Sequence, residues 1–209
     1  MWYWIKTPLF VKKIFRNQIW DIPSEENTLY LTFDDGPTPG VTEKILSTLS
    51  KYKAKATFFC IGKNVKKNLE LYNQIVSSGN SFGNHSMTHP MGWGKSKKMY
   101  LKNVEEAEKL INSNLFRPPY GKINFKSNKA LQKKYKIIMW DVVGGDFDKN
   151  CSETQLIKNI TENAVKGSII VLHDNLIVKE KTLSALPKII EILQKDGYTF
   201  KAIPFSPLR

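Results

Sequence analysis

The chain has 209 residues, of which 41% are hydrophobic and 24% are charged, as is usual for one globular domain. No apolar run approaches the roughly 20 residues that a membrane-spanning helix needs. The net charge is +13, but the 32 Lys and Arg residues are scattered and no nucleic-acid motif accompanies them, so we expect no nucleic-acid partner.

The N-terminal segment, residues 1–28, opens with an aromatic stretch that lacks the apolar core and cleavage site of a cleavable signal. Thr7 and Pro8 predict the start of a short amphipathic helix. Its apolar residues are Phe10, Val11, Ile14 and Phe15. We expect the segment to pack on the domain, and the alternative is peripheral contact with a membrane. The expected location is therefore the cytoplasm or a membrane surface.

After residue 28 the chain alternates between short apolar runs and segments with helical periodicity. Strands are predicted at 29–33, 56–61, 81–83, 115–116, 137–142, 168–172 and 198–203, and helices at 41–52, 65–76, 96–113, 125–134, 154–165 and 183–194. Repeated strand–helix units with apolar strands favour a parallel α/β architecture. We predict a single-domain distorted or incomplete (β/α) barrel of about seven parallel strands over residues 29–203, with a tail at 204–209.

Charged residues and all three histidines of the chain follow the predicted strands. They are Asp34, Asp35, His85, His89, Arg117, Asp146 and His173. In parallel α/β folds the functional sites lie where the strands end, so these side chains are predicted to meet in one site.

His85 and His89 are four residues apart, a spacing that lets both imidazoles reach one ion or that belongs to two unrelated surface histidines. Adding one carboxylate makes a two-histidine, one-carboxylate site with an open position for water, as catalytic metal sites require. Asp34 and Asp35 repel each other, so a division of labour is expected. One would bind the metal and the other would take a proton from water, in an order that the residues leave open.

Three more residues suit the same chemistry. Arg117, which opens a Pro-Pro loop, either aims its guanidinium at the free carboxylate or belongs to a stiff surface turn. His173 ends an apolar strand, where a lone histidine is commonly a satisfied buried residue. Beside a metal site it suits a general acid, and Asp146 would raise its pKa.

Five segments in this order resemble the motifs of the polysaccharide deacetylases, carbohydrate esterase family four. They are TFDDGP at residues 32–37, HSMTH at 85–89, RPPY at 117–120, DF at 146–147 and LH at 172–173. The resemblance covers about residues 29–200. It implies an incomplete (β/α) barrel and a metal-dependent deacetylase, usually with zinc, that hydrolyses the acetamide of N-acetylated sugars such as peptidoglycan or chitin-type glycans.

The resemblance also implies a role for each site residue. The general base would be Asp34, and the metal ligands would be Asp35, His85 and His89. The general acid would be His173, with Arg117 bracing the base and Asp146 tuning the acid. The backbone N–H of Tyr120 would help to hold the oxyanion, and Leu172 and Phe147 would line the acetyl-methyl pocket.

Phe147 departs from the family pattern, which more often has tryptophan there. Phenylalanine keeps an apolar wall but lacks the bulk and the N–H of an indole, so the acyl pocket is expected to differ in shape. The alternative activity on the same residues is hydrolysis of another amide, a formyl or cyclic amide of a small molecule.

Overall fold

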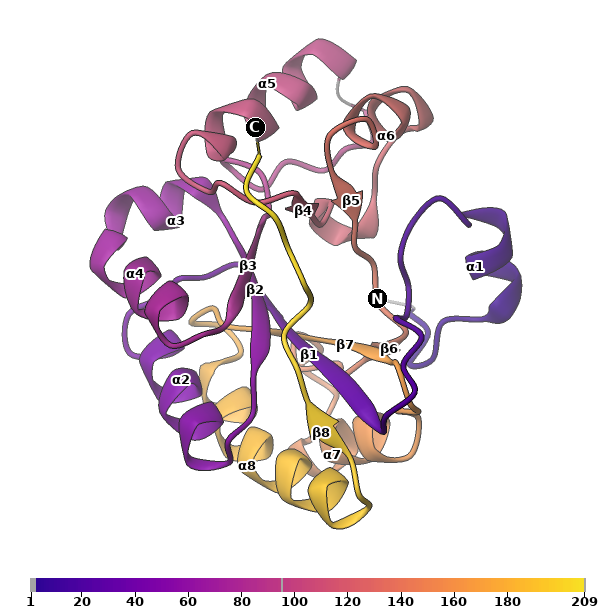
Figure 1. Ribbon diagram of the computed structural model, residues 1–209, viewed down its shortest axis with the longest axis vertical. Coiled ribbons are helices and arrows are strands. Elements are labelled where there is room, and N and C mark those ends of the chain that lie inside the picture. The colour runs from indigo at the N-terminus through magenta and orange to yellow at the C-terminus, as the bar shows by residue number, and fades with distance from the viewer. Residues whose placement is uncertain (1–2, 95, 209) are drawn as a thin grey trace.

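The structure, a computed structural model, describes residues 3–94 and 96–208. Met1 and Trp2 of the N-terminal segment and Arg209 of the tail therefore lie outside the described residues. Helices surround a sheet of parallel strands that curls into a half-barrel (Figure 1). No helix within the described ranges has the length and apolar character needed to cross a bilayer.

The sheet has the strand order β5-β4-β3-β2-β1-β7-β6, and the short β8 pairs with the beginning of β1. The strands are β1 (Thr28–Asp34), β2 (Ala56–Cys60), β3 (Ser81–Asn84), β4 (Leu115–Phe116), β5 (Lys136–Ile137), β6 (Val142–Val143), β7 (Ile169–His173) and β8 (Thr199–Phe200). All the paired strands run parallel. The predicted incomplete barrel of about seven parallel strands in one domain is thus confirmed.

The central strand β1 is buried along its whole length, and its side chains alternate between two cores. Leu31 and Phe33 belong to a large cluster shared with the surrounding helices. Tyr30 belongs to a separate cluster with Phe59 of β2, on the inner face of the curled sheet. This alternation places Asp34, the last residue of β1, on the same inner face as Tyr30.

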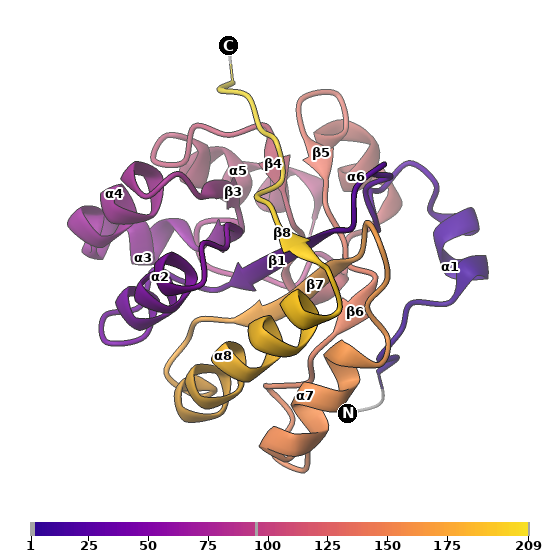
Figure 2. The ribbon, with the colours of Figure 1, turned by 60° about the horizontal axis from the view of Figure 1, so that its bottom comes forward.

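The helices are α1 (Leu9–Ile14), α2 (Thr42–Lys51), α3 (Gly62–Lys67), α4 (Leu69–Ser77), α5 (Lys97–Glu108), α6 (Phe125–Leu131), α7 (Glu153–Thr161) and α8 (Lys179–Lys195). A 3-10 turn covers Pro119–Gly121. Helices α2 to α8 lie around the sheet, whereas α1 stands apart from the others (Figures 1 and 2).

Two predicted elements are divided in the structure. The strand predicted at 137–142 is wrong in its middle, where the carbonyls of Ile138 and Met139 turn to accept hydrogen bonds from Arg117. The helix predicted at 65–76 is interrupted at Asn68, whose φ is −131° and whose side-chain amide donates to the carbonyls of Pro37 and Asn64. Both interruptions come from contacts with distant loops that periodicity does not encode.

The N-terminal segment lies across the seam between the two sheet ends, β5 and β6. Lys6 forms an antiparallel bridge with Val142 of β6, and Ile19 forms a parallel bridge with Ile138, next to β5. Asp141, which is buried in the seam, accepts hydrogen bonds from the ammonium groups of Lys6 and Lys12 at 2.5 and 2.6 Å. Main-chain bridges and buried ion pairs therefore fasten residues 5–21 to the domain.

We expect Asp141→Asn to lower the free energy of unfolding by about 2 kcal/mol, because two ammonium groups lose a buried partner. Urea denaturation of the variant and the wild type measures this difference. Glu26→Gln is the matched control, since the Lys201–Glu26 pair is exposed on both sides and should contribute less than about 0.5 kcal/mol. Equal stability of the two variants would contradict a fastening role for Asp141.

Candidate active site

The ends of strands β1, β3, β4 and β7 bring the predicted residues together. Asp34 ends β1, and its register partner on β7 is His173. His85 directly follows β3, and Arg117 directly follows β4. Since all these strands are parallel, their carboxyl ends meet at one edge of the half-barrel, where an α/β fold carries its site.

Arg117 is completely buried and its guanidinium is surrounded by acceptors. One terminal nitrogen donates to Oδ1 of Asp34 and to the hydroxyl of Thr32, both at 2.7 Å. The other nitrogens donate to the carbonyls of Ile138 and Met139 at 3.2 and 2.9 Å. Burial lowers the pKa of Arg117 from its usual value, and the Asp34 carboxylate opposes that shift. A buried charge is tolerated only with such partners. Arg117 therefore does not belong to a stiff surface turn.

The same arginine also orients a histidine through its backbone. The carbonyl oxygen of Arg117 lies 2.8 Å from Nδ1 of His85. Because a carbonyl only accepts, Nδ1 carries the proton and Nε2 presents its lone pair. That lone pair lies on the side of the two aspartates, 4.0 Å from Oδ2 of Asp34 and 3.7 Å from Oδ1 of Asp35.

Asp35, His85 and His89 form a group whose ligand atoms lie within 4.8 Å of one another. Oδ1 of Asp35 lies 3.3 Å from Nε2 of His89. That oxygen is buried and has no hydrogen-bond partner among the described residues. A buried carboxylate oxygen facing two imidazole nitrogens fits a divalent cation, because an unsatisfied buried acceptor is otherwise costly.

The pKa values of this group also fit metal ligands, which must be deprotonated. Burial and the neighbouring His85 lower the pKa of His89 to about 4, so its ring is neutral at pH 7. Burial alone would raise the pKa of Asp35, but His85, His173 and His89 together hold it below its usual value.

The backbone around the site is held in sparsely populated conformations. Asp35, His89 and Tyr120 have φ values of 87°, 57° and 60°, in the left-handed region that non-glycine residues rarely adopt. Such strain persists only where surrounding contacts enforce it, and it is common at functional sites. The ring of Tyr120 is half exposed and lies 4.6 Å from that of His89.

His173 is paired with Asp146 across the mouth of the site. Its Nδ1 lies 2.9 Å from Oδ1 of Asp146, and its backbone N–H donates to Oδ2 at 2.7 Å. Burial would lower the pKa of His173, but the charge and hydrogen bond of Asp146 outweigh it and raise the pKa to about 10. The imidazole is therefore protonated at neutral pH, and its Nε2–H can donate a proton.

The wall beside His173 is made by Phe147 and by a residue that the sequence analysis did not select. The ring of Phe147 stands edge-on to His173, with centroids 5.5 Å apart. Tyr3 packs on Phe147 at 5.0 Å, and its hydroxyl donates to Asp148 at 3.2 Å. Burial and the Asp148 carboxylate raise the pKa of Tyr3 to about 12. The ring of Tyr3, held by its hydrogen bond to Asp148, thus supports Phe147 from the N-terminal segment.

Leu172 is not placed in an acyl pocket. It is fully buried in the core cluster that packs against the helices, where a Cβ added to Gly144 would lie 2.6 Å from it. Side chains alternate along a strand, so Leu172 and His173 point to opposite faces of β7. The nearest residue of β7 on the face of His173 is Val171, which makes it the better candidate for the pocket wall.

Asp174 and Asn175, the two residues that follow His173, also support the aspartate pair. In the sequence, only their position next to that histidine hints at this role. Asn175 donates to Oδ2 of Asp35 at 2.8 Å, which turns Oδ1 toward the histidines. Asp174 accepts from the backbone N–H of Gly36 at 2.7 Å, and burial raises its pKa to about 7. A Cβ on Gly36 would lie 1.9 Å from Asp174, so the close approach requires glycine.

A family model described as "Polysaccharide deacetylase" matches residues 21–138, more than half of the chain. The chain belongs to the polysaccharide deacetylase family. The resemblance seen in the five motifs is thus confirmed, and the protein is a hydrolase of the amide-cleaving class.

Named relatives agree with this family. The peptidoglycan-N-acetylglucosamine deacetylase of Bacillus cereus is 34% identical over 193 residues, covering 88% of this chain and 90% of the relative. The chitooligosaccharide deacetylase of Azorhizobium caulinodans is 30% identical over 202 residues, covering 88% and 96%. The crystal structure of the Bc1960 peptidoglycan N-acetylglucosamine deacetylase, in complex with a substituted benzamide, superposes with a TM-score of 0.87 at 29% identity and covers 95% of each chain.

The raised pKa of His173 makes a pH-dependent prediction. A histidine whose pKa is about 10 stays protonated through neutral pH and loses its proton as the pH rises through that value. Asp146→Asn removes the charge that raises the pKa, so the alkaline limb of deacetylase activity should move down by about one pH unit or more. A pH profile of kcat compares the two proteins, and an unmoved alkaline limb would contradict the role of Asp146.

Tyr3 should influence how the site receives its substrate. We expect Tyr3→Ala to lower kcat/KM about tenfold, because Phe147 loses the ring that holds it against His173. Tyr3→Phe is the matched control, since it keeps the ring and removes only the hydrogen bond to Asp148. If both variants have the same kcat/KM as the wild type, the N-terminal residue is not part of the site wall.

Proposed function

We propose that this protein removes acetyl groups from N-acetylated sugar units of a glycan, using a divalent metal ion held by Asp35, His85 and His89. The observation that carries the proposal is the asymmetry of the site. A carboxylate braced by a buried arginine lies on one side of a metal-type triad, and a protonated histidine lies beside it on the next strand.

Zinc is the ion we propose, because two imidazoles and one carboxylate suit it and leave a catalytic coordination position open. When bound, the ion supplies a Lewis acid that polarises the acetamide carbonyl and lowers the pKa of a water molecule. The chain's own contribution is the orientation of the three ligands. The Arg117 carbonyl fixes the tautomer of His85, and Asn175 fixes the rotation of Asp35.

Asp34 is proposed as the general base. Arg117 and its own strand hold this carboxylate in place, with Oδ1 hydrogen-bonded to the guanidinium and Oδ2 directed toward His85. A carboxylate held at this position can take a proton from a water molecule as that water attacks the acetamide carbon.

His173 is proposed as the general acid. The Asp146 carboxylate fixes its ring through Nδ1 and keeps it protonated, so Nε2 can deliver a proton to the leaving amine. The amide C–N bond then breaks, and the products are acetate and a free amino sugar. Phe147 and Val171 are proposed walls for the acetyl methyl group, and the N–H of Tyr120 a donor to the oxyanion.

The glycan proposed as substrate is peptidoglycan or a chitin-type oligosaccharide, since relatives named for both types cover most of this chain. A panel of these glycans, with formamides and cyclic amides alongside, tests this choice in the presence of zinc. Release of acetate from the glycans alone supports the proposal. Turnover of only the small amides would replace it with another amide hydrolysis.

The two adjacent aspartates should separate metal binding from catalysis. Purified protein should carry about one zinc-type ion per chain, and Asp35→Ala should lose it because a ligand is removed. Asp34→Asn should keep the ion and lower kcat by about 10²- to 10³-fold, since only the base is lost. Elemental analysis and acetate release measure the two effects.

Asp196→Asn, on the exposed end of α8, is the matched control and should change neither quantity. Full activity of Asp34→Asn would rule out the proposed base. Retention of the metal by Asp35→Ala would rule out the proposed ligand set.

A further inference from the structure

Helix α1 presents its apolar side chains to solvent. Leu9, Phe10 and Ile14 are 73%, 57% and 67% exposed, and none of the six residues of α1 is buried. Together with Lys13, these three residues occupy positions i, i+1, i+4 and i+5, which form one face of a helix. A surface helix of a globular domain ordinarily turns such residues toward the core. The apolar face of α1 points toward solvent instead.

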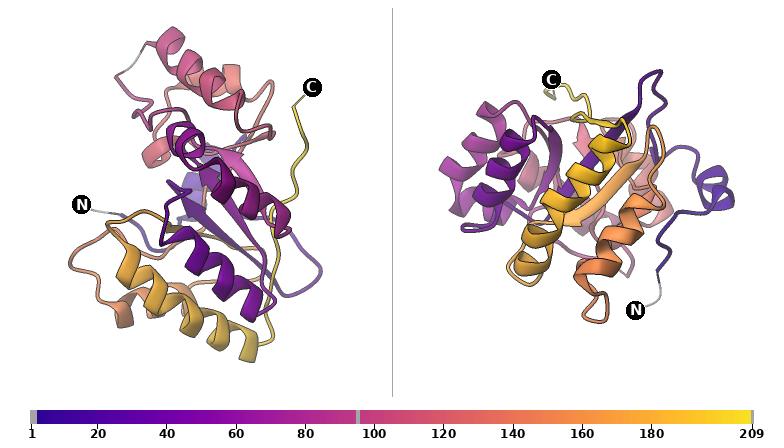
Figure 3. Two further views of the ribbon diagram at one scale, coloured as in Figure 1. Left: turned by 90° about the vertical axis from the view of Figure 1, so that its left-hand side faces the viewer. Right: turned by 90° about the horizontal axis from the view of Figure 1, so that it is seen from below.

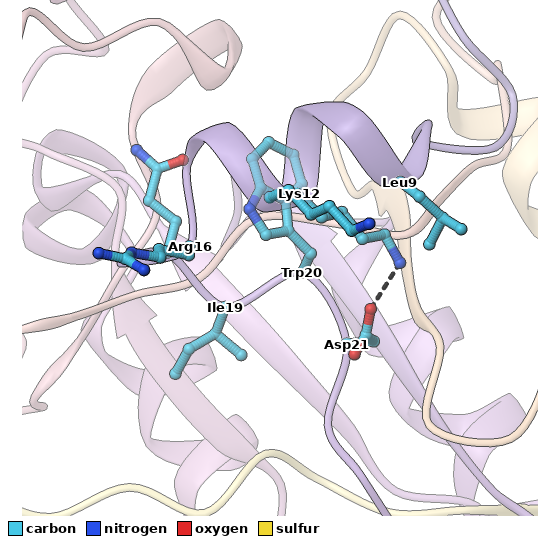
Figure 4. A pocket seen from close by; sticks show the side chains of 8 residues that line it. Leu9, Lys12, Arg16, Ile19, Trp20 and Asp21 are labelled. Carbon is cyan, nitrogen blue, oxygen red and sulfur yellow. Dashed lines mark hydrogen bonds and ion pairs between the residues drawn. The ribbon is translucent and has the colours of Figure 1, made fainter.

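The opposite face of α1 explains this orientation. Val11 packs against the cluster that contains Trp20, and the ammonium group of Lys12 binds Asp21 and Asp141. Figure 4 shows Lys12 beneath the helix, directed at Asp21. A buried ion pair therefore holds the polar side of the helix against the domain and leaves the apolar side outward.

The exposed apolar surface continues beyond the helix. Phe15 is 49% exposed, and Trp4 is 41% exposed and meets the ring of Phe10 edge-on with centroids 6.0 Å apart. We call the surface formed by Trp4, Leu9, Phe10, Ile14 and Phe15 the α1 surface. The ribbon views show α1 standing out from the other helices (Figure 3). Several large apolar side chains exposed together on a projecting element are typical of an interaction site.

Two exposed basic side chains, Lys13 and Arg16, accompany the α1 surface, whereas Lys6 and Lys12 are paired with aspartates. The first 20 residues of the sequence contain four basic residues and no acidic one. Lys13 and Arg16 are exposed, and with Lys12 they line a pocket of about 430 Å³ beside the helix. Figure 4 shows Arg16 reaching away from Asp21, the acidic member of that lining.

We propose that the α1 surface docks this protein on an anionic membrane surface. Large apolar side chains enter the boundary between headgroups and acyl chains, while Lys13 and Arg16 meet the lipid phosphates. A second copy of the chain fits less well, because two proteins of charge +13 repel each other. A nucleic acid would use the charge but leave the apolar side chains in water. The inference is independent of the proposed deacetylation.

Vesicle co-sedimentation with the full chain tests this inference. Binding should be at least about fivefold stronger to phosphatidylcholine vesicles containing phosphatidylglycerol than to phosphatidylcholine alone, and added salt should weaken it. The double variant Phe10→Ser with Ile14→Ser should bind about tenfold more weakly, because two inserted side chains are lost. Ile177→Ser, which replaces an 85% exposed isoleucine away from α1, should bind like the wild type.

A second pair of variants tests the charges. Lys13→Glu with Arg16→Glu should lose the preference for phosphatidylglycerol, whereas Lys66→Glu with Lys67→Glu, on the exposed side of α3, makes the same change in net charge and should keep it. Circular dichroism of each variant shows that it is folded.

Several results would overturn the proposal. The first is absence of wild-type binding to the anionic vesicles, and the second is equal loss in the Ile177→Ser or α3 variants. A third is binding that tolerates the serine variants and fails only with the glutamate variants, which would indicate general attraction to polyanions. A fourth is a dimer in sedimentation that the serine variants dissociate while vesicle binding is unchanged.

Discussion

Arg117 carries a positive charge into a position closed to solvent, and the polar groups around it are arranged to hold that charge. Its guanidinium binds Asp34, while its carbonyl binds His85. The carbonyls of Ile138 and Met139 turn inward to accept from it, which ends β5 and separates it from β6. One buried cation therefore positions the proposed base, orients a metal ligand and shapes the open seam of the barrel.

Residues of the same type acquire different properties from their surroundings. His89 is held near a pKa of 4 by burial and a neighbouring imidazole, whereas Asp146 raises the pKa of His173 to about 10. The first histidine is ready to donate a lone pair and the second to donate a proton. The half-barrel achieves this by placing His89 in the loop after β3 and His173 at the end of β7, on opposite sides of β1.

The strand ends could be predicted because apolar runs of strand length stop at charged or polar residues, as at Asp34 and His173. Their convergence follows from the parallel sheet. Other features depend on contacts between distant segments. The interruption of the strand at Ile138 depends on an arginine 21 residues earlier, and the wall behind Phe147 depends on Tyr3. Leu172 was misplaced because the motif did not reveal which face of β7 it occupies.

The N-terminal segment also bears on where this enzyme begins as a working unit. The family model starts at residue 21, but the chain before it contacts both edges of the seam and supplies Tyr3 to the wall of the site. A recombinant protein that began at residue 21 would keep every motif residue and lose the ring of Tyr3 that packs on Phe147. A purification tag is therefore better fused to the C-terminal end, which leaves the segment before residue 21 unaltered.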